Sequence, residues 1–396
     1  MRKNVPVSEL RFGMYIAELD RPWTETPFRF QGFVLSSEQQ LDALKKYCKS
    51  VVVDSERSTT LAAAPRPGMQ YFGRTVYAER ASVEQELGPA RSAYTSSHTL
   101  VREALTRVRV GSKLDAERVR DAIHSLTESV LRNPNAMLLF SQLREKGDYA
   151  ESHSLDVAIY MTAFGRFLQL EQGQIELLGY LGLLQDIGKV RLPKTLLEKR
   201  GALTPGEFAR AKLHVNYSAQ ILRTTPGLPP DLPRLAMLHH ERHDGSGYPN
   251  RLRGSEIGLI GAIAGIADTF DAMTVPRPYA DAVAPSAAIS SLYKWRDALF
   301  DAGLVEQFIR FVGIFPVGSL VELNSGETGV VISQNPEQRL KPRVVVIRDI
   351  KGVELRPQKL LDLSRDPKAT ADEPYRILRT LEQGRFPVTS EQLFAK

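Results

Sequence analysis

Histidines and aspartates that could bind metal ions are concentrated in one stretch of this 396-residue chain. Five of its seven histidines fall between positions 153 and 243, and two of them are adjacent. Neutral imidazole is the commonest metal ligand in proteins, and a carboxylate can join two cations. A single histidine near a helix end is more often simply packed, but buried imidazoles and carboxylates all need partners, and a metal satisfies them together. We therefore predict a metal site built from His153, Asp186, His214, His239, His240 and Asp268.

The remaining composition excludes several other classes of protein. Cys48 is the single cysteine, so an internal disulfide and a CxxC zinc site are ruled out, and we expect it to be a small buried hydrophobe. The net charge of +6 is scattered without a basic run, which argues against nucleic-acid binding. The longest apolar run, residues 257–267, is about half of the roughly twenty residues that a membrane span needs. Because charges also interrupt the first sixteen residues, we expect no signal peptide, no membrane span and a cytoplasmic location.

Helical periodicity between about residues 135 and 312 predicts the framework that positions these side chains. His153 continues the apolar face of one helix, and Asp268 lies on a helix whose glycines and alanines allow close backbone approach. The clearest helix start is Thr204, an N-cap residue whose capping box is completed by Glu207. The expected fold class is mainly α, with an all-α bundle whose helices include 153–168, 173–187, 204–225, 233–243 and 256–273.

The two flanking segments show different periodicities. The first predicts a small mixed α/β module, with strands near 14–16, 28–35 and 51–53 around a helix at 37–47. The last predicts a small β module with strands at 320–323, 329–332 and 343–347, followed by a tail with a short helix near 375–381. The predicted organisation is 1–55 (N-terminal module), 56–134 (linker and connecting helices), 135–312 (helical domain) and 313–396 (β module and tail).

Further residues join the metal-site candidates in one ordered pattern: His153, Asp186-Ile187-Gly188-Lys189, Pro193, His214, His239-His240-Glu241-Arg242, Asp244-Gly245-Ser246-Gly247-Tyr248-Pro249, Asp268, Asp271-Ala272-Met273-Thr274 and Arg277-Pro278-Tyr279. Over about residues 150–310 this pattern resembles the HD-GYP family, a branch of the HD-domain phosphohydrolases. Residues 10–16 and Trp23 resemble the N-terminal accessory domain that often precedes it. The resemblance implies an HD-type helical bundle.

The resemblance also implies an activity and its metal ions. The family hydrolyses the bacterial second messenger cyclic di-GMP at a centre of two or three divalent ions, commonly iron or manganese. His153, Asp186 and Asp268 would bind a first metal, and Asp186 would bridge to a second. That second metal would be held by His214, His239 and His240.

The remaining implied roles concern the substrate. Lys189 would hold a phosphate oxygen, so that Asp186 and Lys189 are the candidate catalytic residues. Arg277 and the loop formed by Gly247, Tyr248 and Pro249 would help to shape the nucleotide pocket. In some relatives this loop contacts diguanylate cyclase (GGDEF-type) domains.

One position departs from the family pattern. The family places a histidine directly before the metal-bridging aspartate, whereas this chain has Gln185. A neutral amide oxygen is a poorer ligand for transition metals than an imidazole nitrogen, so the first metal site keeps three of its four protein ligands. The glutamate expected for a third metal is also missing, because Tyr149 stands four residues before His153. We therefore expect one or two metal ions per chain.

The sequence leaves alternatives open. The favoured hypothesis is a metal-dependent cyclic di-GMP phosphodiesterase with activity lowered by Gln185. A second is a catalytically degenerate domain that binds the nucleotide, or a partner cyclase domain, and regulates without catalysis. A third, hydrolysis of another nucleotide, is disfavoured by the Gly-Tyr-Pro loop. The product and the oligomeric state, a homodimer included, stay open at this point.

Overall fold

The computed structural model describes residues 2–10, 14–22, 26–28, 32–35, 38–54, 71–143, 149–275, 282–335, 338–381 and 393. The chain divides into two compact units, residues 1–70 and 71–396. Trp23, part of the 10–16 motif and the linker expected after residue 55 lie outside the described residues.

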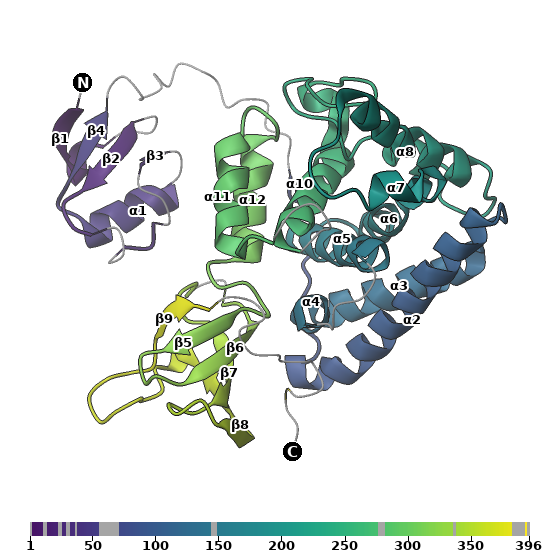
Figure 1. The fold of residues 1–396 in the computed structure, drawn as a ribbon. Helices are drawn as coiled ribbons and strands as arrows, with labels where there is room; N and C mark the ends of the chain where they lie inside the picture. Colours follow the sequence, from purple (N-terminus) through teal and green to yellow (C-terminus); the bar gives the residue numbers. More distant parts are fainter. Residues whose placement is uncertain are drawn as a thin grey trace. The chain divides into compact units, whose positions relative to one another are not determined.

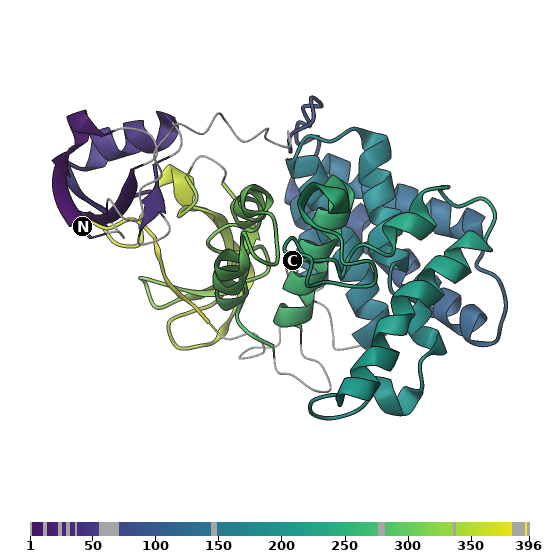
Figure 2. The ribbon, with the colours of Figure 1, turned by 90° about the horizontal axis from the view of Figure 1, so that it is seen from above.

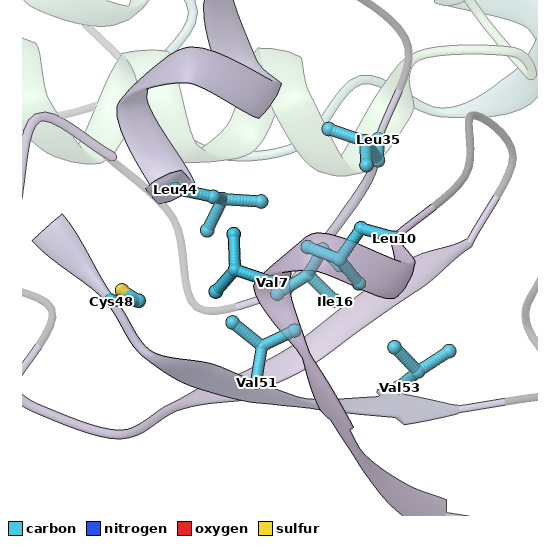
Figure 3. Close-up of a cluster of buried hydrophobic side chains, with 8 residues drawn as sticks. All are labelled: Val7, Leu10, Ile16, Leu35, Leu44, Cys48, Val51 and Val53. Carbon is cyan, nitrogen blue, oxygen red and sulfur yellow. The ribbon is translucent and has the colours of Figure 1, made fainter. Parts of the chain in front are cut away.

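The first unit is a small antiparallel sheet covered by one helix. The sheet has the order β1-β4-β2-β3, and its strands are β1 (Arg2–Pro6), β2 (Tyr15–Leu19), β3 (Phe33–Val34) and β4 (Ser50–Asp54). Helix α1 (Glu38–Tyr47) contributes Leu44 to a core that also contains Ile16, Val51 and Cys48, as Figure 3 shows. The expected strands at 14–16 and 51–53, the helix and the buried cysteine are therefore confirmed. Of the strand expected over 28–35, the structure describes only the two residues of β3, and residues 29–31 lie outside the described residues. Strand β1 escaped prediction because its residues are mostly exposed at the edge of the sheet and show no apolar alternation.

Helices form most of the second unit (Figure 1). Helix α5 (Tyr149–Phe167) is its centre, since it packs against six other helices. These are α2 (Val83–Arg109), α3 (Ala116–Arg132), α4 (Pro134–Leu143), α6 (Gln172–Leu184), α10 (Gly258–Thr274) and α12 (Ala302–Val312). The long helices α2 and α3 thus belong to the packed bundle, and Arg343 of the β module forms a 2.6 Å ion pair with Glu84 of α2. The mainly α fold class is confirmed.

Shorter elements complete the bundle. They are η3 (Ile187–Arg191), α7 (Lys194–Leu197), α8 (Pro205–Arg223), α9 (Leu232–Leu235), η4 (Gly254–Ile257) and α11 (Pro285–Trp295), which lies beside α12 (Figures 1 and 2). The predicted start of α8 is confirmed, since Thr204 accepts from the Glu207 amide while Glu207 accepts from the Thr204 amide. The helix predicted over 233–243 is wrong, because α9 ends at Leu235. Successive side chains of an α-helix point about 100° apart, whereas His239 and His240 both belong to one candidate ligand group. A turn at these two residues allows both side chains to point toward that group.

The end of the chain folds into a five-stranded antiparallel sheet of order β8-β7-β6-β5-β9. The three expected strands are present as β5 (Leu320–Leu323), β6 (Thr328–Ser333) and β7 (Arg343–Arg348). Two exposed edge strands, β8 (Glu354–Asp362) and β9 (Ile377–Thr380), extend this sheet. The short helix predicted near 375–381 is therefore wrong: this segment pairs with β5, because the backbone groups of β5 need hydrogen-bond partners on that side.

One helical stretch of the described chain, Gly254–Thr274, is long and apolar enough by length and composition to cross a membrane. Within the fold, 61% of its apolar window is buried inside the protein. Helix α10, which forms most of this stretch, packs against α5, α6, α11 and α12. Its apolar character is therefore that of a core helix.

Candidate metal centre

Close backbone contacts bring the predicted ligands together from separate elements. A Cβ atom at Gly188 of η3 would lie 2.2 Å from the carbonyl oxygen of His214, so η3 rests directly against α8. A Cβ atom at Gly182 of α6 would lie 2.5 Å from the Cα of Ala158 on α5. Only glycine permits both approaches, and together they place Asp186, between α6 and η3, beside ligands from α5 and from α8.

The first ligand group contains Asp186 and the three histidines His214, His239 and His240. The Nδ1 atom of His214 lies 2.6 Å from the Ala211 carbonyl oxygen, and the Nδ1 atom of His239 lies 2.9 Å from that of Ala236. Because a carbonyl only accepts, both Nδ1 atoms carry the proton and both Nε2 atoms present a lone pair. These Nε2 atoms lie 3.2 Å and 3.6 Å from Oδ1 of Asp186. Two imidazoles are thus held by backbone acceptors in the tautomer that binds metals.

The histidine His240 completes this group from the side. Its ring lies 4.1 Å from the His239 ring and 5.1 Å from the His214 ring, centroid to centroid. Burial, and then the neighbouring His239, hold the pKa of His240 well below its usual range. His240 is therefore neutral at physiological pH and can act as a ligand.

The second ligand group contains His153 of α5, Asp186 and Asp268. The Nε2 atom of His153 lies 3.2 Å from Oδ1 of Asp268 and 3.5 Å from Oδ2 of Asp186. Its Nδ1 atom donates to Oδ2 of Asp271 at 2.6 Å, which leaves Nε2 as the metal-binding atom. A carboxylate that orients a ligating imidazole in this way is a common feature of metal sites.

The charges of this region call for a cation. The Lys189 ammonium, 2.6 Å from Oδ2 of Asp186, is one positive charge beside the three carboxylates of Asp186, Asp268 and Asp271. Burial alone would raise the pKa of Asp186, but the Lys189 ammonium holds it well below its usual range, and the pKa of Asp268 also lies below its usual range. Ionised carboxylates therefore outnumber the adjacent ammonium in a buried place, which divalent cations would neutralise.

Unpaired atoms support the same fit. Oδ1 of Asp186 and the Nε2 atoms of His214 and His239 are buried and make no hydrogen bond. Buried polar atoms without partners are rare in native proteins, and their grouping at one place points to a missing ligand. The donor set of imidazole nitrogen and carboxylate oxygen suits divalent metal ions. The residues present therefore fit metal ions.

The loop that follows His240 packs against the group of Asp186, His214, His239 and His240 through the ring of His240. Glu241 is buried and accepts from the backbone amides of Asn250 and Leu252, at 2.7 Å and 3.0 Å. A Cβ atom at Gly247 would lie 2.4 Å from the Arg242 amide nitrogen, so this glycine lets the loop fold back tightly. The Tyr248 ring then stacks on the ring of His240, with centroids 4.7 Å apart. The peptide bond between Tyr248 and Pro249 is cis.

The Gln185 side chain, where the family has its histidine, is fully buried, and neither atom of its amide makes a hydrogen bond. It closes the C-terminus of α6 directly before Asp186. Arg277 lies outside the described residues, as does the side chain of Tyr149.

Two contributors escaped sequence reasoning. Asp271 belongs to the family pattern, which implies no role for it. Its spacing of three from Asp268 on one helix is the signal for it, because such residues share a face. Glu241 follows the histidine pair, but its partners lie in the loop backbone, so no pattern of side chains could reveal them.

Three segments of the chain match known protein families. Residues 135–304 match a family model described as HD domain, residues 2–119 match a domain of unknown function (DUF3391), and residues 320–371 match a KOW domain associated with HD domain. Among curated proteins, the chain is 33% identical over 374 residues to "Cyclic di-GMP phosphodiesterase PA4108" of Pseudomonas aeruginosa, covering 92% of this chain and 90% of that one. It is also 35% identical over 160 residues to "3'3'-cGAMP-specific phosphodiesterase 2" of Vibrio cholerae, covering 40% of this chain and 31% of that one.

Among solved structures, the chain matches "Bd1817, a HDG"Y"P protein from Bdellovibrio bacteriovorus" with a TM-score of 0.46 and 15% identity. That match covers 78% of this chain and 98% of the other. The identity of 33% to the Pseudomonas aeruginosa protein extends over nearly the full length of both chains, and the HD domain match contains every predicted metal ligand. This chain belongs to the HD-GYP family of HD-domain phosphohydrolases.

Proposed function

We propose that this chain hydrolyses cyclic di-GMP and that Gln185 makes it slower than a relative with the complete ligand set. The observation that carries the proposal is the pair of converging ligand groups that share Asp186. The names of its relatives support the substrate, since the full-length match is named a cyclic di-GMP phosphodiesterase.

In this proposal each ligand group holds one divalent ion, iron or manganese. The group of His153, Asp186 and Asp268 would hold one ion, and the group of Asp186, His214, His239 and His240 would hold the other. Such ions lower the pKa of a water molecule and neutralise charge on a phosphodiester during its hydrolysis. Asp271 acts as a positioning residue, since it fixes the ring orientation of His153.

The chain supplies the remaining contacts to the substrate. The Lys189 ammonium is partly exposed next to Asp186 and can donate to a phosphate oxygen there. Burial, and then Asp186 and Asp268, raise the pKa of Tyr248, so its hydroxyl keeps its proton and can donate to an anionic ligand. Gly247, Tyr248, Pro249 and Arg277 would shape the nucleotide pocket.

The second candidate function is regulation without catalysis, and Gln185 is the observation that favours it. Binding of cyclic di-GMP, or of a GGDEF-type cyclase domain at the loop containing Tyr248, would then be the output of the chain. Measuring metal content and turnover in the native protein and in Gln185→His separates the two. Turnover by the native protein supports the enzyme, whereas turnover by the variant alone, with nucleotide binding by both, supports the regulator.

The cellular setting completes the proposal. From the composition we expect a cytoplasmic protein that has no membrane span and does not bind nucleic acid. Its oligomeric state, a homodimer included, stays open. Cell fractionation and light scattering of the purified chain test these two points.

A further inference from the structure

An exposed aromatic ring and a lysine lie on α8 beside the Tyr248 loop. The Phe208 ring meets the Tyr248 ring edge to face, at 85° and with centroids 6.2 Å apart. Nζ of Lys212, one helical turn after Phe208, lies 4.6 Å from the Phe208 centroid and 5.3 Å from the Tyr248 centroid. We call Phe208 and Lys212 the α8 platform.

The requirements of the fold do not account for the α8 platform. Phe208 is the fourth residue of α8, where an apolar side chain often packs against the residue before the N-cap. That role needs any apolar residue and burial, yet Phe208 is 47% exposed. Its exposed ring therefore offers an apolar face on which another flat ring can stack.

The lysine also differs from its neighbours. Lys189 pairs with Asp186, and Lys199 pairs with Glu207. Among the residues that the structure describes, no carboxylate forms an ion pair with Lys212, whose ammonium lies over the two rings. An unneutralised cation at this place suits an anionic ligand that also carries a flat ring.

A continuous series of ring contacts joins the α8 platform to the metal ligands. His240 stacks on Tyr248 with an angle of 27° between the rings, and Tyr248 meets Phe208. Phe208 is therefore two ring contacts away from a candidate metal ligand. A dinucleotide whose phosphate lies at the ligand groups has bases that extend outward, and this series marks a direction that one base can take.

We propose that the α8 platform is a nucleobase subsite: Phe208 stacks on one base of the cyclic dinucleotide, and Lys212 neutralises its neighbouring phosphate. This inference rests on the proposed function, because it takes the ligand to be a cyclic dinucleotide. It assigns affinity for the substrate to two residues outside the ligand groups. Stacking tolerates any base, so the subsite contributes affinity more than choice of purine.

Titration calorimetry of cyclic di-GMP into the full-length, manganese-loaded chain tests the subsite, with the nucleotide checked for hydrolysis afterwards. Phe208→Leu keeps an apolar residue at this helix position and removes the stacking face, whereas Phe208→Trp keeps the face. Loss of one base stack weakens binding by roughly 5- to 150-fold. We expect Phe208→Leu to bind at least about tenfold more weakly and Phe208→Trp to bind within about threefold of the native chain.

Lys212→Gln tests the charge, with Lys351→Gln in the exposed turn after β7 as its matched control. We expect Lys212→Gln alone to weaken binding at low salt, by a factor that shrinks at high salt because ions screen the interaction. Native binding that persists unchanged in Phe208→Leu, with an unchanged melting temperature, overturns the subsite and leaves the proposed function standing. A native chain that binds no cyclic di-GMP overturns the proposed function and the subsite with it.

Discussion

Replacing Gln185 with leucine separates the role of its amide in the fold from its role toward metal ions. The side chain is fully buried, and its Oε1 and Nε2 atoms both lack hydrogen bonds. Each buried polar group without a partner costs about 1–3 kcal/mol. Leucine is of similar size and has no polar atom. In the metal-free protein, where the amide has no ion to bind, leucine therefore removes this cost.

The expected effect therefore has opposite signs with and without metal. In chelator-treated protein, Gln185→Leu gains about 1–3 kcal/mol, which raises the melting temperature by roughly 1.5–4.5 °C for the unit of residues 71–396. With manganese present, the variant loses part of the stabilisation by metal, because an amide oxygen next to Asp186 no longer contributes. Each tenfold loss of metal affinity at saturating metal removes about 1.4 kcal/mol of that stabilisation.

The assay is thermal unfolding followed by circular dichroism, in chelator and in a manganese titration. Gln307→Leu is the matched control, since the Oε1 atom of Gln307 on α12 is also buried and unpaired but lies outside both ligand groups. The control should leave the metal-induced shift unchanged. Gln185→His should increase the free energy by which manganese stabilises the fold by about 1.4–2.7 kcal/mol, which corresponds to a gain of one to two orders of magnitude in metal affinity.

Two results would refute this reasoning. A lower melting temperature of Gln185→Leu in chelator would mean that the amide is hydrogen bonded in the native protein. A metal-induced shift equal in the native chain, Gln185→Leu and Gln185→His would mean that position 185 does not act on the metal ions at all.

Three further outcomes are expected. Asp271→Asn should lower manganese affinity about 10- to 100-fold in titration calorimetry, since it removes the carboxylate that orients an imidazole ligand; unchanged affinity would exclude that role. Gly247→Ala should cost about 1–3 kcal/mol or more in urea unfolding, because its Cβ would meet backbone atoms, whereas Gly206→Ala, with open space around it, should gain roughly 0.4–1 kcal/mol. The hydrogen bond from Lys199 lowers the pKa of Glu207 to about 2 from its ordinary value near 4.5, so stability contributed by this carboxylate is present above pH 4.5 and is lost as the pH falls toward 2. Glu207→Gln should lack this acid-dependent loss when melting temperatures are followed between pH 5 and 2.

Local signals predicted those elements whose cause is local. The start of α8 was predictable because the capping box of Thr204 and Glu207 lies within four residues of the chain. The strands β5, β6 and β7 were predictable because each buries alternate or continuous apolar residues. Strand β9 was not, because its residues are mostly exposed and its place depends on pairing with β5, more than fifty residues earlier.

In the candidate site, too, some features are predictable from local sequence and others depend on distant parts of the chain. The types of the ligands are evident in the sequence, since few roles other than metal binding explain so many buried imidazoles and aspartates. The contacts that orient them are not evident, because the partners of His214 and His239 are backbone carbonyls and the partner of His153 lies on a helix more than one hundred residues later. Sequence patterns report side chains that share an element, and these contacts join separate elements.

The two oxygens of Asp186 indicate which of the two metal ions Gln185 affects. Oδ1 faces His214 and His239, whereas Oδ2 faces His153 and Lys189. A ligand lost beside His153 therefore leaves Oδ1 and its imidazoles complete, so the native chain should retain one metal ion at full affinity and hold the other weakly. Gln185→His should then raise the metal content from about one ion per chain toward two without a change of fold. Since hydrolysis in the proposed mechanism needs both ions, occupancy of the weaker site decides whether this member of the family acts as an enzyme or as a regulator.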